Sequence, residues 1–536
     1  MRRFFGVLGI LLGACLLVFI GMGVFLMLAP GTKLFGVQYI KPSSTTSANV
    51  TKEYSDVVNG GISIETYGVP INIEYTTSGS FSFEFIQKFN GFTRSKIDQP
   101  TLSVGLDDDG NLFVRTSEFK RFIWGSNANG YVLNCKIPAL YKKSLTISST
   151  ASNINLSANA DTVGNISNLT IITKGSLKMT GDFVVEKLAC RDIKQKINIP
   201  LSVQLTGDVN IQQNKKSTSI AANIGGKLTF ASKGGSLTFN SCAQLEATTK
   251  GGSVKSITTE TAVYGNAIIS SGRGSVTLQH VGGDLQITTS RGKIVLGQNQ
   301  ESVKAGCDGK VNLKTTSGKV LIKGNYTATD KSVNITTTSG DIRVGESGRI
   351  ELNKLTKDQV SINELVINTK KGKVVVETAE NVKITGKTGN VTVANFAKAT
   401  IKTTSGDVKV GTRVIGAELD ITTGTNGNVQ AYYLTGKTTI NTKGKVYTSF
   451  KSLMGKIEIN GAKKSITVVL PNGFDMSSRI FWIDSTKRSA DIQIGEFEKQ
   501  AKHYHSVEEV PEGMSEKLIK ISSTNGYIRV VDENHR

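Results

Sequence analysis

Two histidines lie one residue apart near the end of the chain, in the segment Lys502-His503-Tyr504-His505. Side chains at positions i and i+2 of a β-strand point to the same face, so two such imidazoles can bind one metal ion. No cysteine lies near the pair in the sequence, and the closest acid is Glu508. We therefore interpret the pair as exposed loop residues and predict no metal ligand there.

Acidic residues directly follow glycine at the predicted turns of the repeats, as in Asp208, Asp284, Asp341 and Asp407. Polysaccharide lyases and hydrolases need clustered carboxylates or basic groups on one strand face. An acid after a corner glycine instead suits a turn, with its side chain in water. The alternative is a weak cation ladder of acids stacked at equivalent corners. No paired nucleophile and base stands out, so we predict no catalytic residue, no cofactor and no enzymatic activity.

Three short segments mimic known ligand-binding loops. Gly386-Lys387-Thr388 and Gly436-Lys437-Thr438 end like a phosphate-binding loop, but neither has the glycine that the motif requires five residues earlier. The segment Asp107-Asp108-Asp109-Gly110-Asn111 resembles part of a calcium loop, but Leu112 stands at the sixth position, where that loop needs glycine. We predict a hairpin turn for residues 107–111 and no phosphate or metal site in any of the three.

A recurring eight-residue sequence motif is expected to position the side chains that bind a partner. Thr-Thr-Ser-Gly-Asp-Ile-Arg-Val at residues 337–344 returns nearly unchanged at 403–410, and a further variant stands at 315–322. Apolar residues at alternate positions after the glycine indicate a strand. Glycine after Ser, Lys or Asn indicates a tight turn, because glycine adopts positive φ without steric cost. Each copy therefore predicts a strand, a tight corner and a second strand.

The spacing of these corner glycines predicts the fold. Successive gaps cluster near 9 and near 17 to 22 residues, and residues 201–470 contain no proline, which a paired strand excludes. A propeller blade needs about 40–50 residues, and the leucine-rich signature is absent. We predict an all-β fold, a β-solenoid (β-helix-like) with coils of about 20 residues, capped at both ends by non-repetitive segments.

The N-terminal segment 4–29 contains no charged residue and is long enough to cross a membrane as a helix, which needs about 20 residues. Arg2 and Arg3 precede it, so we expect residues 1–3 in the cytoplasm and the rest of the chain outside, as a single-pass protein of the cell membrane. A cleaved signal peptide and a lipoprotein signal, indicated by Leu12-Gly13-Ala14-Cys15, are the alternatives.

Changes in composition divide the chain. A proline- and Ser/Thr-containing stretch after the apolar segment reads as a flexible linker, and aromatic residues then give way to the glycine repeats. The predicted parts are a cytoplasmic N-terminus at 1–3, a transmembrane anchor at 4–29, a linker at 30–50, a β entry module at 51–153, solenoid repeats at 154–460 and a C-terminal β cap at 461–536.

The net charge is +21, from 64 Lys and Arg against 43 Asp and Glu, which favours anionic partners. Alternatively, lysines at outward strand positions keep a long β surface soluble. The basic residues are spread along the repeats without a compact run, so no specific nucleic-acid partner is predicted. Four of the five cysteines lie far apart without a C-x-x-C pair, and we expect buried thiols, with two disulfides as the alternative.

Three phrases link the chain to a known family: Pro70–Tyr75, the strand-and-proline phrase at Tyr131–Pro138 and again at Ile466–Pro471, and the closing Thr524–Val530. In these the chain resembles the bacterial putative-adhesin family, whose domain has no known biochemical function and often follows a membrane anchor. The resemblance covers roughly residues 50–531. It implies a β-helix-like fold outside the cell and supplies no catalytic residues. The greater length of this chain implies an expanded or duplicated solenoid.

These observations give three hypotheses for function. The first is a non-enzymatic cell-surface adhesin that presents a long basic solenoid to an envelope polymer such as an anionic polysaccharide, to a matrix or to another cell. The second is a surface scaffold that associates with itself. The third is a carbohydrate-active enzyme, which a groove lined by two acids about 5–10 Å apart would favour.

Overall fold

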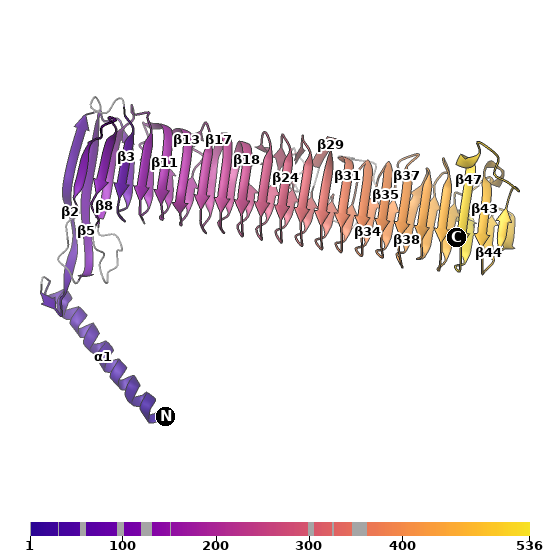
Figure 1. The fold of residues 1–536 in the computed structure, drawn as a ribbon, viewed down its shortest axis with the longest axis horizontal. Helices are drawn as coiled ribbons and strands as arrows, with labels where there is room; N and C mark the ends of the chain where they lie inside the picture. Colours follow the sequence, from indigo (N-terminus) through magenta and orange to yellow (C-terminus); the bar gives the residue numbers. More distant parts are fainter. Residues whose placement is uncertain are drawn as a thin grey trace. The chain divides into compact units, whose positions relative to one another are not determined.

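The structure is a computed structural model that describes residues 2–30, 32–53, 60–93, 101–118, 131–150, 152–297, 305–323, 326–345 and 362–536. The chain forms two compact units, Met1–Phe239 and Asn240–Arg536. Both are built of β-strands, and α1 (Arg2–Leu28) is the single α-helix of the described residues (Figure 1). The prediction of an all-β fold behind one N-terminal apolar helix is confirmed.

Helix α1 and the strands after it begin the first unit. Within the described residues, Leu8–Leu28 is the one helical stretch long and apolar enough to cross a membrane. Residues 30–50, expected as a flexible linker, contain β1 (Lys33–Leu34) and most of β2 (Val37–Glu53), which pairs antiparallel with β5 (Ser80–Thr93). The pairing tolerates Pro42 because the register shifts between Ile40 and Ser43, so the proline lies at an irregularity of the ladder.

Beyond its antiparallel pairs, the first unit stacks its strands in parallel. β3 (Ile62–Thr66) lies between β7 (Leu112–Thr116) and β9 (Leu145–Ser149), and β9 pairs in turn with β11 (Val163–Thr173). Strands of the predicted entry module therefore pair directly with strands of the predicted repeat region. The further strands of this unit are β4 (Ile71–Thr76), β6 (Leu102–Leu106), β8 (Tyr131–Pro138), β10 (Ile154–Ala158), β12 (Leu177–Thr180), β13 (Asp182–Ile193), β14 (Ile197–Ile199), β15 (Val203–Leu205), β16 (Val209–Gln213) and β17 (Thr218–Ser232).

The second unit consists mainly of two rows of parallel strands joined at a tight corner (Figure 1). The first row runs toward the corner and contains β21 (Ala267–Ser271), β24 (Leu285–Thr289), β27 (Val311–Thr315), β29 (Tyr326–Thr337), β31 (Ile362–Thr369), β33 (Asn381–Gly386), β35 (Lys398–Thr403), β37 (Glu418–Thr423), β39 (Thr438–Thr442), β41 (Ile457–Gly461), β47 (Leu518–Ser523) and β43 (Ile480–Ser485).

The second row leaves the corner. It contains β19 (Val254–Ser256), β22 (Val276–Leu278), β25 (Ile294–Leu296), β28 (Val320–Ile322), β30 (Ile342–Val344), β32 (Val374–Val376), β34 (Val391–Ala394), β36 (Val408–Gly411), β38 (Val429–Leu434), β40 (Val446–Phe450), β42 (Ile466–Leu470), β48 (Ile528–Asp532) and β44 (Ala490–Ile494). Short strands β20 (Thr261–Val263), β23 (His280–Val281) and β26 (Ala305–Cys307) add a third row. β18 (Leu237–Thr249) spans the boundary between the two units and pairs with β21.

Alternate side chains of each strand fill the interior. Isoleucines at equivalent positions of successive first-row strands form one continuous buried column: Ile335, Ile367, Ile384, Ile401, Ile421, Ile440, Ile459, Ile521 and Ile483. Their burial is the main stabilising term of such a fold, at about 1.5–3 kcal/mol for each side chain. The prediction for the cysteines is confirmed, because Cys135, Cys190, Cys242 and Cys307 are buried and form no disulfide.

The order of strands at the C-terminal end differs from their order in the sequence. β47 pairs with β41 on one side and with β43 on the other, although β43 precedes it in the chain. Between them the chain forms β45 (Phe497–Ala501) and β46 (His503–His505), which pair antiparallel with β44 and β43. The last copy of the repeated phrase therefore lies one coil inside the end of the stack.

Candidate functional site

The corner between the two strand rows is held together by the first threonine of the repeated phrase. Thr337 is buried, and its Oγ1 accepts a hydrogen bond of 2.9 Å from the backbone N–H of Gly340. Thr315 caps Gly318 in the same way, at 2.9 Å. The leading threonine thus satisfies a buried donor that would otherwise cost about 1–3 kcal/mol.

Glycine is required at these corners because successive coils approach closely. A Cβ atom at Gly340 would lie 1.9 Å from the carbonyl oxygen of Gly318, and one at Gly318 would lie 2.0 Å from that of Gly292. The same contact recurs at Gly372, Gly389 and other corner glycines, none of which has a positive φ. The expectation of a positive-φ turn is therefore wrong, and close backbone approach is the physical reason for the glycine.

The four aspartates predicted at turns take part in hydrogen bonding between coils. In each, Oδ1 accepts from a backbone N–H of the next coil: Asp208 from Lys227 at 2.8 Å, Asp284 from Lys310 at 2.8 Å, Asp341 from Lys373 at 3.0 Å and Asp407 from Asn428 at 2.9 Å. The expectation that these side chains are directed only at water is corrected. Asn428 performs the same role for Lys445, so a neutral amide is sufficient.

The corner segments of the second unit form a surface that we call the basic edge. It carries fifteen exposed Lys and Arg side chains and two Asp. Its segments are residues 250–253, 272–275, 290–293, 316–319, 338–341, 370–373, 387–390, 404–407, 424–428, 443–445, 462–465, 486–489 and 524–527. Backbone bonds stack them, as from Ser339 N–H to the Thr316 carbonyl and from Lys371 N–H to the Thr338 carbonyl.

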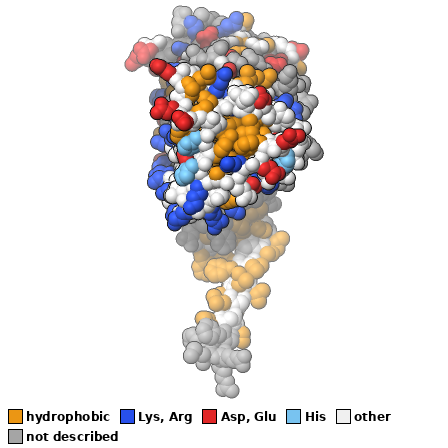
Figure 2. Space-filling model, turned by 90° about the vertical axis from the view of Figure 1, so that its right-hand side faces the viewer, with side chains coloured by type: hydrophobic (Ala, Val, Ile, Leu, Met, Phe, Trp, Pro, Cys, Tyr) orange, Lys and Arg blue, Asp and Glu red, His pale blue; other side chains and the backbone are white. Residues whose placement is uncertain are grey.

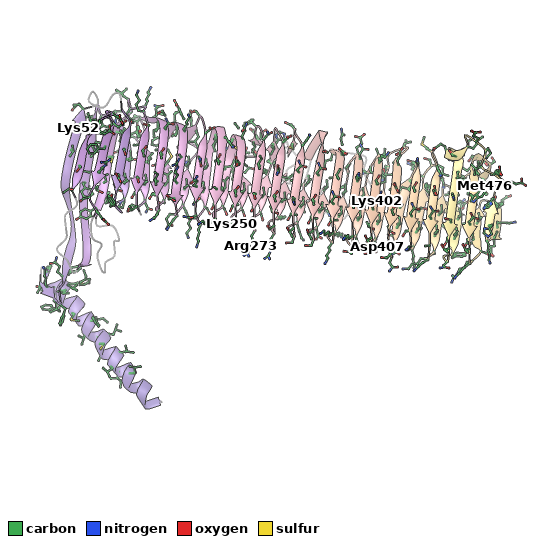
Figure 3. All side chains as sticks on the ribbon, viewed as in Figure 1. Lys52, Lys250, Arg273, Lys402, Asp407 and Met476 are labelled. Atoms are coloured by element: carbon green, nitrogen blue, oxygen red, sulfur yellow. The ribbon has the colours of Figure 1, made fainter. Side chains whose placement is uncertain are left out.

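The basic edge holds the net charge of its unit. Residues 240–536 contain 40 Lys and Arg and 28 Asp and Glu, so 25 basic and 26 acidic residues remain outside the edge. In Figure 3, Lys250, Arg273 and Asp407 lie along one border of the sheets, whereas Lys402 lies on a sheet face. Figure 2, viewed onto the C-terminal end, shows Lys and Arg gathered toward the lower left. The rest of the unit is close to neutral.

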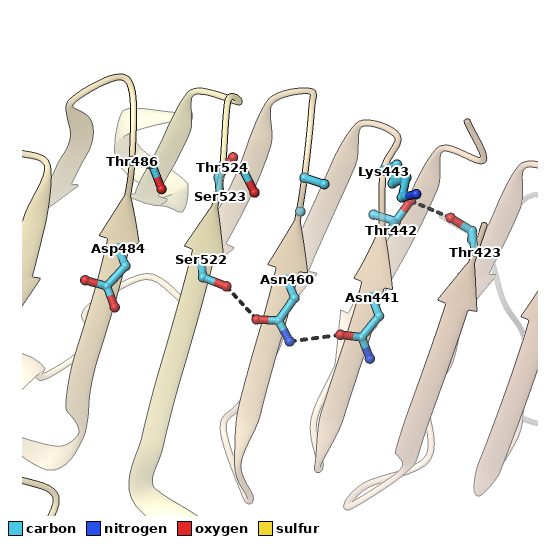
Figure 4. Close-up of a pocket in the computed structure, with 12 residues that line it drawn as sticks. Thr423, Asn441, Thr442, Lys443, Asn460, Asp484, Thr486, Ser522, Ser523 and Thr524 are labelled. Atoms are coloured by element: carbon cyan, nitrogen blue, oxygen red, sulfur yellow. Dashed lines mark hydrogen bonds between the residues drawn. The ribbon is translucent and has the colours of Figure 1, made fainter. Parts of the chain in front are cut away.

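A polar groove of about 400 Å³ opens beside the basic edge near the C-terminal end (Figure 4). Ser522 donates to Asn460 Oδ1 at 2.6 Å, and Asn460 Nδ2 donates to Asn441 Oδ1 at 2.8 Å. Lys443 lies at one side and Asp484 at the other, the one acid among the described lining residues. Such a groove can hold a small polar ligand by hydrogen bonds, but it does not provide the two acids of a glycosidase.

The two histidines lie on strand β46 and not in a loop. His503 Nδ1 and His505 Nε2 both contact Asp484 Oδ1, at 2.8 and 3.0 Å, and the His505 ring stacks on Trp482 with centroids 3.8 Å apart. Partial burial would raise the pKa of Asp484, but hydrogen bonds from the two imidazoles outweigh it and the pKa is lowered. Among the described residues, no group of three His, Cys, Asp or Glu is arranged to hold a metal ion.

The three segments that mimic ligand-binding loops lie in turns and at the start of a strand. Residues 107–111 connect the antiparallel strands β6 and β7, and Asp107 Oδ1 accepts from the N–H groups of Asp109 and Asn111, so the predicted hairpin turn is confirmed. Lys387 belongs to the basic edge, and Thr438 begins strand β39 with its side chain buried.

The chain matches the family model described as Toastrack DUF4097 over residues 60–354 and again over 347–531. It belongs to this family. The family has a β-solenoid-like fold and no assigned function, so membership supports the predicted architecture and leaves the ligand open.

No curated protein matches this Toastrack chain. One solved structure is similar, a putative cell adhesion protein from Clostridium sporogenes ATCC 15579, at 8% identity over 92% of this chain and 100% of that chain. Its TM-score of 0.15 is too low to carry an argument.

Neither the basic edge nor the groove of this Toastrack chain was predicted from its sequence. We predicted basic residues spread along the repeats without a compact run. However, the same position relative to the corner glycine recurs from one cation to another, as in Lys319 and Lys373. That position was the available signal. The groove had a weaker one, the polar residue before the end of successive strands at Asn441, Asn460 and Ser522.

Proposed function

We propose that the protein is a non-enzymatic cell-surface adhesin that binds an anionic envelope polymer, a matrix or another cell through the basic edge. One observation carries this proposal: the fifteen basic side chains stand at the corners of one border, while charge is balanced over the rest of the unit. Surface charge confined to one side attracts and orients a partner of opposite charge.

The corner architecture supports a binding role for these side chains. Corner backbone groups are bonded to neighbouring coils, and the aspartates cap backbone N–H groups, so neither needs a ligand. Among the described residues of the edge, one basic side chain has an ion pair, Lys319 with Asp341 at 4.0 Å. The other cations are exposed to solvent and require no rearrangement to meet an anion.

Helix α1 supports attachment to a membrane. We propose that it is an uncleaved anchor and that the remaining chain lies outside the cell. Its apolar stretch Leu8–Leu28 can cross a bilayer. Protease added to intact cells should remove epitopes of both units, and protection of these epitopes until lysis would contradict the proposed orientation.

Binding by the full-length protein in detergent tests the proposed function. Inorganic polyphosphate, polygalacturonate and neutral dextran are immobilised, and the salt concentration is varied between about 50 and 200 mM. We expect both polyanions to bind with an affinity that falls steeply with salt, and dextran not to bind. Failure of both polyanions to bind, or binding insensitive to salt, would overturn the electrostatic function. Shortening of the polygalacturonate during incubation would contradict a non-enzymatic role.

A further inference from the structure

We propose that the partner of the basic edge is a linear polyanion that lies along the stack of corners and contacts several coils at once. This inference rests on the proposed function and specifies the shape and charge pattern of the ligand. The chemistry required is a flexible polymer with a phosphate or carboxylate group on each repeat unit.

The geometry of the corners favours a linear ligand. Neighbouring strands in a sheet lie about 4.8 Å apart, so equivalent corners follow one another at this short interval. The glycine contacts fix the interval from coil to coil, because carbonyl oxygens and glycine Cα atoms meet without space for a side chain. A compact anionic protein would touch a few corners, whereas an extended chain follows all of them.

The composition of the edge favours contacts without strict geometry. Twelve of its fifteen cations are lysines, and three are arginines, Arg273, Arg291 and Arg488. Lysine is a hydrated point charge on a flexible stem, whereas arginine recognises planar anions in a fixed, two-pronged geometry. A lysine-rich row therefore suits a polymer whose charges need not match each coil.

Two aspartates divide the edge into three basic segments. Asp341 and Asp407 occupy the position where other corners carry Lys293, Lys319 or Lys373. The segments are residues 250–319 with five cations, 370–387 with four and 443–488 with six. A short anionic chain is expected to occupy one segment, and a longer chain has to pass an acidic corner to reach the next.

A size series of the polymers tests this inference in the full-length protein. Polyphosphate and galacturonate chains of increasing length are compared at equal concentration of charge. We expect affinity to rise with length and the salt dependence to steepen by about 0.7 in log–log slope for each added contact, as for single-stranded polyanions. Equal affinity of short and long chains would overturn the inference and leave the proposed function standing. Preference for one polymer would identify the anion as phosphate or carboxylate.

Two variants with the same charge change locate the site. The edge variant carries glutamine at Lys370, Lys371, Lys373 and Lys387. The face variant carries glutamine at Lys314, Lys383, Lys402 and Lys409, which are exposed on strands. We expect the edge variant to lose on the order of ten-fold in affinity for long chains and the face variant to change little. Equal losses would overturn the placement on the edge.

The acidic corners give a gain-of-function test. Asp341→Asn and Asp407→Asn together keep the oxygen that caps the next coil, as Asn428 does in the native chain. We expect this variant to bind long chains several-fold more tightly and short chains as before. An equal gain for short chains would contradict the division into segments.

Discussion

The corners and the outward sheet faces of the same coils differ in the neighbours of their lysines. On the faces, lysines lie beside acids or neutral residues: Lys398 pairs with Glu418 at 2.7 Å, and Lys402 lies between Thr385 and Thr422 in the strand register. On the basic edge, lysines follow lysines, as in Lys370 and Lys371.

The difference has a physical reason. Side chains directly opposite each other on neighbouring strands are held close, and like charges there are destabilising. Side chains at turns point outward from a curved border and can separate in solvent, where repulsion is weak. The fold therefore tolerates a row of cations at the corners that it would not tolerate on a face. The charged side chains of the corners are available for binding, whereas the backbone groups of the corners form the hydrogen bonds that stabilise the stack.

The largest expected effect comes from the corner backbone. In one corner, Gly235→Ala would place a Cβ 2.0 Å from the carbonyl oxygen of Lys216, whereas nothing lies within 4 Å of a Cβ at Gly234. We expect Gly235→Ala to destabilise its unit by about 3 kcal/mol, because the atom it meets is backbone and cannot move aside. Gly234→Ala is the matched control and should be within about 0.5 kcal/mol of the native protein.

Urea denaturation followed by circular dichroism measures both glycine variants, and hydrogen exchange reports whether the loss is local to the corner. Equal stability of the two variants would show that coil-to-coil contact does not explain the glycine column.

The second largest effect on stability is expected from a buried threonine of a corner, compared with the exposed threonine beside it. Thr337→Val keeps the shape of the side chain but leaves the Gly340 N–H without its acceptor. We expect a loss of about 1–2 kcal/mol, the cost of a buried unsatisfied donor. Thr338→Val changes the neighbouring exposed residue and should cost less than about 0.5 kcal/mol. If the two variants were equally stable in urea, the leading threonine would not be the cap of the corner.

The sequence was sufficient for the local structure because the signals are local. Alternation around residues such as Ile401 and Val408 predicts which side chains are buried, and the glycine marks the corner. The cause of the glycine requirement was not predictable in this way. It depends on the carbonyl of the preceding coil, which for Gly340 belongs to Gly318, and such a contact exists only once the register between coils is known.

The basic edge was hidden for the same reason. Lys250, Arg273 and Lys319 are separated by dozens of residues, and the intervals between corners vary, so no fixed period brings them together in the sequence. The insertion of β47 between β41 and β43 was equally inaccessible, because pairing of Ile521 with Ile459 spans 62 residues. Non-local pairing decides both features, and the position of a cation beside a corner glycine is the local signal that the edge leaves in the sequence.

A third prediction concerns the acid at a corner. Asp407→Ala removes the acceptor of the Asn428 N–H, and we expect a loss of about 1 kcal/mol. Asp407→Asn keeps an oxygen at the same place and should restore native stability. Thermal denaturation of the three proteins at pH 7 provides the comparison. A loss of similar size in Asp407→Asn would mean that the negative charge, and not the hydrogen bond, stabilises the corner.

The smallest expected effect concerns Asp484, an acid on a sheet face. Its pKa is lowered in the folded protein, so its contribution is present above the unfolded pKa of about 3.9 and is lost as pH falls through the folded value. We expect Asp484→Asn to be less stable than the native protein by up to about 1 kcal/mol at pH 7, with the difference shrinking below about pH 4. The control is Asp420→Asn, a change at an outward acid on the same sheet. Urea midpoints of the variants between about pH 3 and about pH 7, a range that begins below the unfolded pKa, decide the point. A pH-independent difference for Asp484→Asn would mean that His503 and His505 stabilise a neutral partner equally well, and the face acid would then resemble the corner acid.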